Sequence, residues 1–179
     1  IDGPVTVAGY SMGGALATAF AAEEGLRIRS LVLMAPSGLA PVYAAPKDRI
    51  WTAPVLGDWL MPVAGGWALR RELAAEAGAP TVIPDLTTRL VAETRRRGYL
   101  PSVLSSRRHV LSQLLEDDHR TIADYGTAVL GIWGGADQVI PLSSMGRMAE
   151  LNPNAQHVQL AKATHNFPQT HPGRIAEIL

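Results

Sequence analysis

Three polar residues that lie far apart in the chain have the types and the order needed for acyl-transfer chemistry: Ser11, Asp137 and His165. A serine hydroxyl is a weak nucleophile, so it needs a neighbouring base and a group that orients that base. The order serine, aspartate, histidine is one of three unrelated orders in which hydrolases arrange such groups along the chain. The sequence therefore predicts a hydrolytic site, provided that the fold brings the three residues together.

Ser11 lies in the pattern G-Y-S-M-G at residues 9–13, between a predicted strand and a predicted helix. Residues 5–8 are apolar and β-branched, which predicts a buried strand, and the Ala-rich residues 15–24 favour a helix. A sharp turn between the two exposes the serine at the carboxyl end of the strand. This context makes the pattern a candidate nucleophile elbow.

The elbow also predicts what its neighbours do. We expect Ser11 to adopt a strained backbone conformation, at a cost on the order of 1–3 kcal/mol. We expect glycine to be required at Gly9 and Gly13, because a side chain at either position would collide with the tightly folded backbone. The N–H of Met12, at the first turn of the helix, is the expected oxyanion donor.

The other two residues of the predicted site also follow predicted strands. Residues 127–133 form an apolar run that ends before Asp137, and residues 156–160 alternate as an edge strand would before His165. A further apolar run at residues 30–35 completes a strand–helix–strand unit with parallel pairing. Sites form at the carboxyl edge of such sheets, so the loops of Asp137 and His165 are expected side by side.

The chain has five histidines, and none of their spacings is typical of a metal site, so no metal or other cofactor is expected. His157, within an alternating strand, and His171, before the last helix, are alternatives to His165 as the base. His109 and His119 are expected on solvated helices.

The middle of the chain has a different character. Prolines recur between residues 39 and 123 and no strand pattern appears, which favours an inserted helical cap. We therefore expect hydrolase core at residues 1–38 and 124–179, with the cap at 39–123. Its helices are expected near residues 47–60, 66–77, 85–97 and 102–118.

Apolar side chains in the cap suggest a substrate surface. Trp51 and Trp59 are candidates to line an apolar acyl pocket, together with Tyr10 and Val139 beside the predicted site. The alternative is that the tryptophans pack the cap against the core. The arginines at residues 95–97 are expected to form a solvated helix end, and an anion clamp is the alternative.

The composition of the chain bears on its binding partners and its location. The formal net charge is zero, which gives no electrostatic reason to expect a nucleic-acid partner. The chain has no cysteine, which fits a reducing compartment, so we expect a cytoplasmic location. No apolar run approaches the ~20 residues that a membrane span requires. A buried strand that begins within a few residues of Ile1 predicts that a further segment of the protein precedes this chain.

Taken with their flanking residues, these motifs resemble the C-terminal part of the α/β-hydrolase family, in its cap-bearing group of serine esterases, lipases and C–C hydrolases. Residues 9–14 are similar to the family's elbow and residues 132–141 to its acid loop. The histidine loop at 164–166 matches less well, because the family usually has glycine where Thr164 stands.

The resemblance implies an α/β fold with a parallel sheet and roles for individual residues. Ser11 would be the nucleophile, His165 the general base and acid, and Asp137 the carboxylate that orients the imidazole. Met12 N–H would be one oxyanion donor, while the family takes its second from a loop after an earlier strand, outside this chain. The expected substrate is a small, apolar carboxylic ester or related acyl compound. C–C bond hydrolysis, cleavage at an N-terminal proline, perhydrolysis and ligand binding without turnover are the alternatives.

Overall fold

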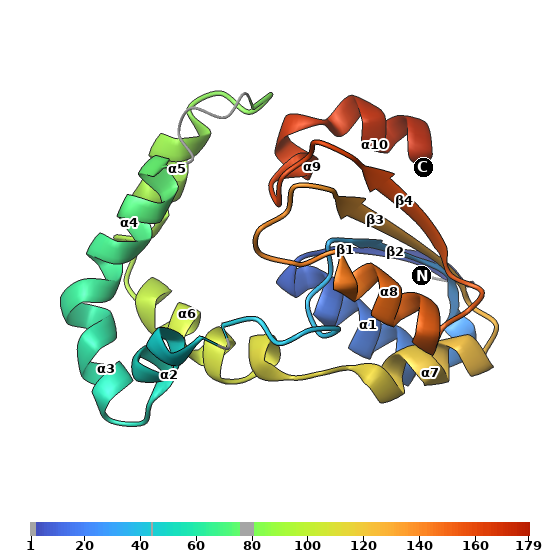
Figure 1. Cartoon of the computed structure of the whole chain (residues 1–179), viewed down its shortest axis with the longest axis horizontal. Helices are drawn as coiled ribbons and strands as arrows, with labels where there is room; N and C mark the ends of the chain where they lie inside the picture. The colour runs from blue at the N-terminus through green and yellow to red at the C-terminus, as the bar shows by residue number, and fades with distance from the viewer. Residues whose placement is uncertain (1–2, 44, 76–80) are drawn as a thin grey trace. The chain divides into compact units, whose positions relative to one another are not determined.

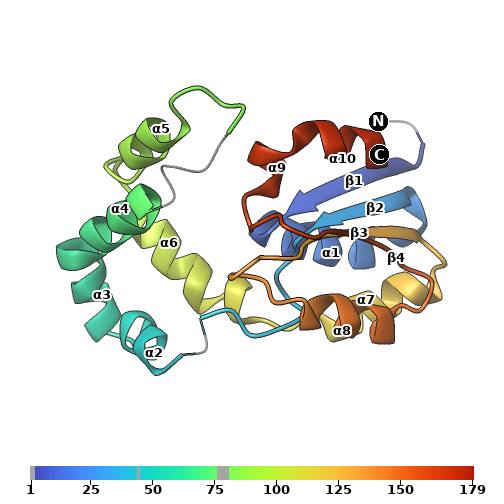
Figure 2. The same ribbon diagram turned by 45° about the horizontal axis from the view of Figure 1, so that its top comes forward.

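The structure is a computed structural model that describes residues 3–43, 45–75 and 81–179. Its contacts divide the chain into two compact units (Figures 1 and 2). The sheet unit comprises residues 1–42 and 110–167, and the helical unit comprises residues 43–109 and 168–179. The sequence predicts the core at residues 1–38 and 124–179 and the cap at residues 39–123. In the structure, residues 39–42 and 110–123 belong to the sheet unit, and residues 168–179 belong to the helical unit.

The sheet unit is built on a parallel sheet. Among the described residues it contains four strands in the order β1-β2-β3-β4, and every neighbouring pair is parallel. All four predicted strands are therefore present, and all point their carboxyl ends to the same edge. The strands are β1 (Val5–Tyr10), β2 (Ile28–Met34), β3 (Ala128–Gly134) and β4 (Gln156–Leu160).

The two inner strands, β2 and β3, contribute the most deeply buried apolar side chains of the sheet. Leu31 and Leu33 of β2 and Ile132 and Trp133 of β3 are at most 1% exposed. By contrast, β1 is not the buried strand that its composition predicts, because Thr6 and other side chains of the strand are exposed. The reason is its position at one end of the sheet, where β2 is its neighbour on one side.

Three longer helices lie on the same face of the sheet in both views of the molecule (Figures 1 and 2). α1 packs directly on β1 and β2, and α7 packs against both α1 and α8. The sheet unit also has two short turns of 3₁₀-helix. These elements are α1 (Met12–Glu24), η1 (Gly25–Arg27), η3 (Val110–Ser112), α7 (Glu116–Asp124) and α8 (Ser143–Leu151).

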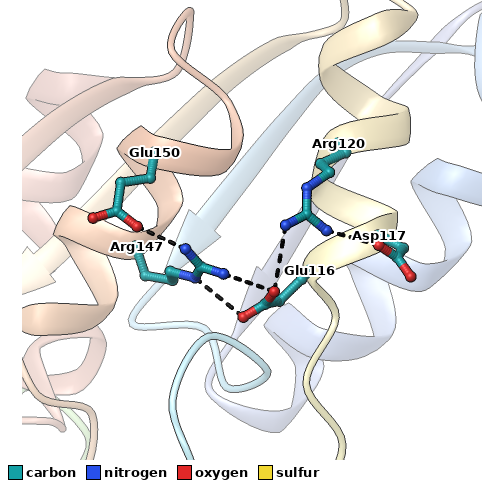
Figure 3. Close-up of polar contacts among 5 residues, drawn as sticks. All are labelled: Glu116, Asp117, Arg120, Arg147 and Glu150. Atoms are coloured by element: carbon teal, nitrogen blue, oxygen red, sulfur yellow. Dashed lines mark hydrogen bonds and ion pairs between the residues drawn. The ribbon is translucent and has the colours of Figure 1, made fainter.

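A chain of ion pairs joins α7 to α8 (Figure 3). Arg147 of α8 contacts both carboxylate oxygens of Glu116, at 3.1 Å from its Nε and 2.7 Å from its Nη2. The hydrogen bond from Arg147 is the main cause that holds the pKa of Glu116 below its ordinary value. Arg147 also binds Glu150, and Arg120 binds Glu116 and Asp117. Because these side chains are partly exposed, the network fixes the pairing of the two helices more than it stabilises the fold.

The helical unit consists of short helices. Arg108 links several of them, because its guanidinium donates to the carbonyls of Thr52 and Ala53 and binds the Asp58 carboxylate at 2.6 Å. The elements are α2 (Pro46–Thr52), α3 (Leu56–Leu60), the π-helical η2 (Met61–Gly65), α4 (Gly66–Ala75), α5 (Leu86–Glu93), α6 (Tyr99–Arg108) and α10 (Pro172–Ile178). α9 (Phe167–Thr170) begins at the last residue of the sheet unit.

Two predicted helices are interrupted. The segment 47–60 is divided into α2 and α3, because Pro54 and the positive φ of Val55 (66°) break the helical path. The segment 102–118 ends at Arg108, and the next long helix, α7, starts at Glu116. The predicted end at residue 77 of a third helix lies outside the described residues.

Candidate active site

The turn after β1 holds Ser11 in the conformation expected of a nucleophile elbow. Ser11 has φ 52° and ψ −120° and is the N-cap of α1. Non-glycine residues rarely adopt a positive φ, and such strain persists only where surrounding contacts enforce it. Here the Ser11 N–H donates to Met34 O at 2.9 Å, and its carbonyl accepts from the N–H groups of Gly14 (2.9 Å) and Ser37 (3.1 Å).

The glycines of the elbow have unequal roles. A Cβ on Gly9 would lie 2.3 Å from the carbonyl oxygen of Gly13, so a side chain is excluded there, as predicted. A Cβ on Gly13 would meet nothing within 4 Å, so the expectation for that position is wrong. The second crowded position is Gly14, where a Cβ would lie 2.7 Å from the Pro36 side chain in the loop after β2.

A close backbone contact places the Asp137 loop beside the His165 loop. The N–H groups of Gly135 and Ala136 donate to Leu160 O (2.9 Å) and Ala163 O (3.0 Å) across the ends of β3 and β4. A Cβ on Gly135 would lie 2.2 Å from Ala161 O, so this approach requires glycine. The predicted adjacency of the two loops thus depends on Gly135, a requirement that no pattern in the sequence indicates.

Asp137 is held in place by hydrogen bonds to both of its carboxylate oxygens. Oδ1 accepts from the N–H groups of Val139 (2.7 Å) and Ile140 (2.9 Å), while Oδ2 lies 2.8 Å from His165 Nδ1. The Asp137 side chain is 1% exposed. Burial acts to raise the pKa of Asp137, but the hydrogen bonds from His165, Ile140 and Val139 outweigh it and hold the pKa below its ordinary value. Asp137 is therefore a buried, ionised carboxylate.

The imidazole of His165 bridges the other two residues. Its Nε2 lies 2.9 Å from Ser11 Oγ, and its Nδ1 faces Asp137. A proton on Nδ1 that is donated to the carboxylate leaves Nε2 free to accept the serine hydroxyl. Thr164, where the family usually has glycine, does not have a positive φ. Its hydroxyl binds Asn166 Oδ1 at 2.5 Å, so this loop accommodates a side chain.

Tyr10 contacts the histidine loop directly. Its hydroxyl donates to the carbonyl of His165 at 2.9 Å, and the two ring centroids are 5.2 Å apart. The Tyr10 ring also meets Phe167 edge-on, with ring centroids 6.4 Å apart. Its place beside Ser11 predicts Tyr10 as a substrate residue, but no feature of the elbow pattern indicates this hydrogen bond.

The remaining candidates occupy different places. Met12 is the first residue of α1, so its N–H has no acceptor within the helix. Val139 has a partly exposed side chain two residues after Asp137. Trp51 and Trp59 belong to the helical unit, where Trp51 is half-buried and Trp59 is 72% exposed. A role for these three side chains in binding substrate stays a prediction.

The other histidines have partners or surroundings of their own. His157 Nδ1 accepts from Trp133 Nε1 at 3.2 Å, and His171 Nδ1 lies 2.7 Å from the Thr170 hydroxyl. His109 is exposed, as expected. His119 is not on a solvated helix, because α7 buries it completely within the sheet unit, and burial lowers its pKa to about 4.

The comparisons agree with this geometry at the level of the fold. A profile described as "Alpha/beta hydrolase family" matches residues 1–178. The chain belongs to this family. No curated protein matches the α/β-hydrolase chain at a significant level.

Solved structures similar to this chain include esterases and other hydrolases. An esterase from Thermogutta terrifontis has a TM-score of 0.70 at 19% identity, over 98% of this chain and 63% of the esterase. The 2-hydroxy-6-oxo-6-phenylhexa-2,4-dienoate hydrolase from Rhodococcus sp. strain RHA1 has a TM-score of 0.70 at 18% identity, over 98% and 62%. A meta-cleavage product hydrolase from Pseudomonas fluorescens IP01 has a TM-score of 0.65 at 22% identity, over 98% and 62%. At identities this low, the structural similarity shows the shared fold alone.

The chain thus spans just over three fifths of the length of these similar structures. Within the described part of the chain, no cluster of three His, Cys, Asp or Glu residues is arranged to hold a metal ion. A search of the same residues for a helix long and apolar enough to cross a membrane finds none.

Proposed function

We propose that this chain carries the catalytic centre of a serine hydrolase that cleaves a carboxylic ester or a related acyl compound. The observation that carries the proposal is the continuous contact from Asp137 through His165 to Ser11, at 2.8 Å and 2.9 Å. The strained Ser11 supports it, because strain of this kind clusters at active sites.

In the proposed first half-reaction, Ser11 Oγ attacks the carbonyl carbon of the substrate while its proton passes to His165 Nε2. Asp137 stabilises the resulting imidazolium through Nδ1. The negative charge that develops on the carbonyl oxygen is met by the N–H of Met12. As the tetrahedral intermediate collapses, the alcohol leaves with the proton from His165, and the acyl group stays on Ser11.

In the second half-reaction, His165 removes a proton from a water molecule that attacks the acyl-enzyme. The carboxylic acid is then released, and the proton returns to Ser11 Oγ. The cycle needs a histidine that is neutral before each attack and an aspartate that stays ionised. The low pKa of Asp137 meets the second condition near neutral pH.

Covalent labelling is the sharpest test of this proposal, because it detects an activated serine even where turnover is slow. A fluorophosphonate is expected to add one phosphonyl group to the chain, as measured by intact mass, with the modified peptide containing Ser11. Hydrolysis of p-nitrophenyl butyrate is the accompanying turnover assay. Ser11→Ala is expected to abolish both signals.

Ser102→Ala is the matched control, because its hydroxyl binds Gly98 O on the surface of the helical unit. This variant is expected to be labelled at the wild-type rate. Labelling that persists in Ser11→Ala, or an absence of labelling in the wild-type chain, contradicts the proposed nucleophile. Tight binding of acyl ligands without labelling would favour a binding protein on the same fold.

A further inference from the structure

A cavity of about 110 Å³ lies within the helical unit. Its walls come from α2, η2, α4 and α6 together with Tyr43, so every lining residue lies between positions 43 and 109. Trp51, Met61 and Leu69 form the apolar part of its surface, and Met61 is 1% exposed. One wall is the π-helical turn η2, a feature that is often found at functional sites. The cavity contains none of the residues of the proposed catalytic centre.

Three charged residues also line this cavity, and they do not pair with one another. Asp48, Glu72 and Arg107 form no ion pair with any residue in the described ranges. The guanidinium of Arg107 lies over the ring of Tyr43, with its central carbon 4.5 Å from the ring centroid. The Nε of Arg107 is buried and has no hydrogen-bond partner among the described residues.

The neighbouring arginine shows that this arrangement is not a general property of the end of α6. The guanidinium of Arg108 donates hydrogen bonds to the carbonyls of Thr52 and Ala53 and to the Asp58 carboxylate. Arg107 has no such acceptors, although a buried donor without a partner is unfavourable. A ligand acceptor at Arg107 would satisfy the guanidinium.

We propose that this cavity binds a small zwitterion whose ammonium and carboxylate groups are joined by an apolar body, as in an apolar α-amino acid. The planar guanidinium of Arg107 suits a carboxylate, and Asp48 and Glu72 suit an ammonium group. The faces of aromatic residues such as Trp51 attract cations as well. An anion alone would meet two carboxylates and an amine alone would meet the guanidinium, so a ligand with both charges fits best.

The direct test compares leucine with two analogues that each lack one charged group. The carboxylate analogue is 4-methylpentanoate and the amine analogue is 3-methylbutylamine. Isothermal titration calorimetry gives the affinities of the three compounds. Leucine is expected to bind at least about tenfold more tightly than either analogue, which corresponds to one charge-assisted hydrogen bond.

Variants assign the two ends of the ligand. Arg107→Gln is expected to remove the preference for leucine over 3-methylbutylamine. The double variant Asp48→Asn/Glu72→Gln is expected to remove the preference for leucine over 4-methylpentanoate. Arg96→Gln is the matched control, because Arg96 pairs with Glu93 on the surface of the same unit and does not line the cavity. If thermal unfolding shows that Arg107→Gln does not fold, the double variant carries the test.

Three results would overturn the proposal: no binding of leucine at millimolar concentrations, equal affinities for leucine and one analogue, or an equal loss in Arg96→Gln. The measurement is of binding and involves neither Ser11 nor His165. Its outcome is therefore independent of whether the chain hydrolyses esters.

Discussion

The hydroxyl of Tyr10 donates a hydrogen bond to the main-chain carbonyl of His165 at 2.9 Å, and the two rings lie with their centroids 5.2 Å apart. Tyr10 immediately precedes Ser11, so the residue beside the proposed nucleophile also holds the loop that carries the proposed base. This contact joins the turn after β1 to the loop after β4. We therefore propose that Tyr10 positions the loop of His165, and a contact of Tyr10 with substrate stays a prediction.

Tyr10→Phe keeps the ring and removes the hydrogen bond, which costs about 1 kcal/mol. If the hydroxyl positions His165, kcat for p-nitrophenyl butyrate falls about fivefold at nearly constant KM, because the loss concerns the transition state. If Tyr10 binds substrate instead, as the sequence suggested, KM rises at constant kcat. Tyr125→Phe is the control, since its partly exposed hydroxyl makes no hydrogen bond with the described residues.

A second prediction separates the glycines of the elbow. In Gly9→Ala the added methyl group overlaps the carbonyl of Gly13, so the variant is expected to be about 1–3 kcal/mol less stable than the wild type. Gly13 lies in the helix with open space around its Cα, so Gly13→Ala is expected to be neutral or to stabilise by about 0.4–1 kcal/mol. Urea unfolding of the two variants measures both effects. Equal losses in the two would show that the motif's glycines are both required, contrary to the structure.

The comparison of sequence and structure shows which features local patterns specify. The inner strands β2 and β3 were predictable because buried parallel strands are short apolar runs. The edge at which Ser11, Asp137 and His165 meet follows from the common direction of the four strands. The end of α6 at Arg108 was not predictable, because the apolar stripe of residues 102–118 continues past this residue. In the structure, residues 110–112 form η3 and residues 116–118 begin α7 of the sheet unit, and neither segment extends α6.

Contacts between distant loops escaped the sequence analysis for a related reason. The crowding at Gly14 comes from Pro36, and that at Gly135 from Ala161, so neither requirement is visible in the residue's own surroundings along the chain. The hydrogen bond of Tyr10 likewise depends on where residue 165 lies in space. Such requirements arise from the packing of one loop on another, which a pattern within one loop does not encode.

Asp137→Asn tests the electrostatics of the site. The amide keeps the shape but removes the charge that orients His165, so activity is expected to fall on the order of 10⁴-fold with the fold retained. Because the pKa of Asp137 is lower in the folded than in the unfolded state, its carboxylate stabilises the fold above about pH 4. That contribution is lost as the pH falls through the folded-state pKa.

The measurement is the free energy of unfolding of both proteins between about pH 6 and pH 3. As the pH falls over this range, the wild type is expected to lose more stability than Asp137→Asn. The difference reports on Asp137, because the two proteins have all other carboxyl groups in common. Parallel curves would show that the hydrogen bonds from Val139, Ile140 and His165 do not favour the ionised form.

Replacing His119 by an apolar residue is expected to stabilise the protein in mild acid. The residue is 0% exposed, both ring nitrogens lack partners among the described residues, and burial lowers its pKa to about 4. The unfolded chain takes up a proton below about pH 6.5, while the folded chain does not until the pH is near 4. The folded state therefore loses stability as the pH falls through this window, by about 2 kcal/mol at pH 5.

His119→Met retains a side chain of similar size and removes this titration. Relative to its own value near pH 7, the variant is expected to keep about 2 kcal/mol more stability at pH 5 than the wild type, as measured by urea unfolding. Ile122→Met is the control, because Ile122 is equally buried on the same helix and carries no ionisable group. Its change in stability is expected to be the same at both pH values. A wild-type stability that does not fall relative to His119→Met would mean that the buried imidazole accepts a proton in the folded state.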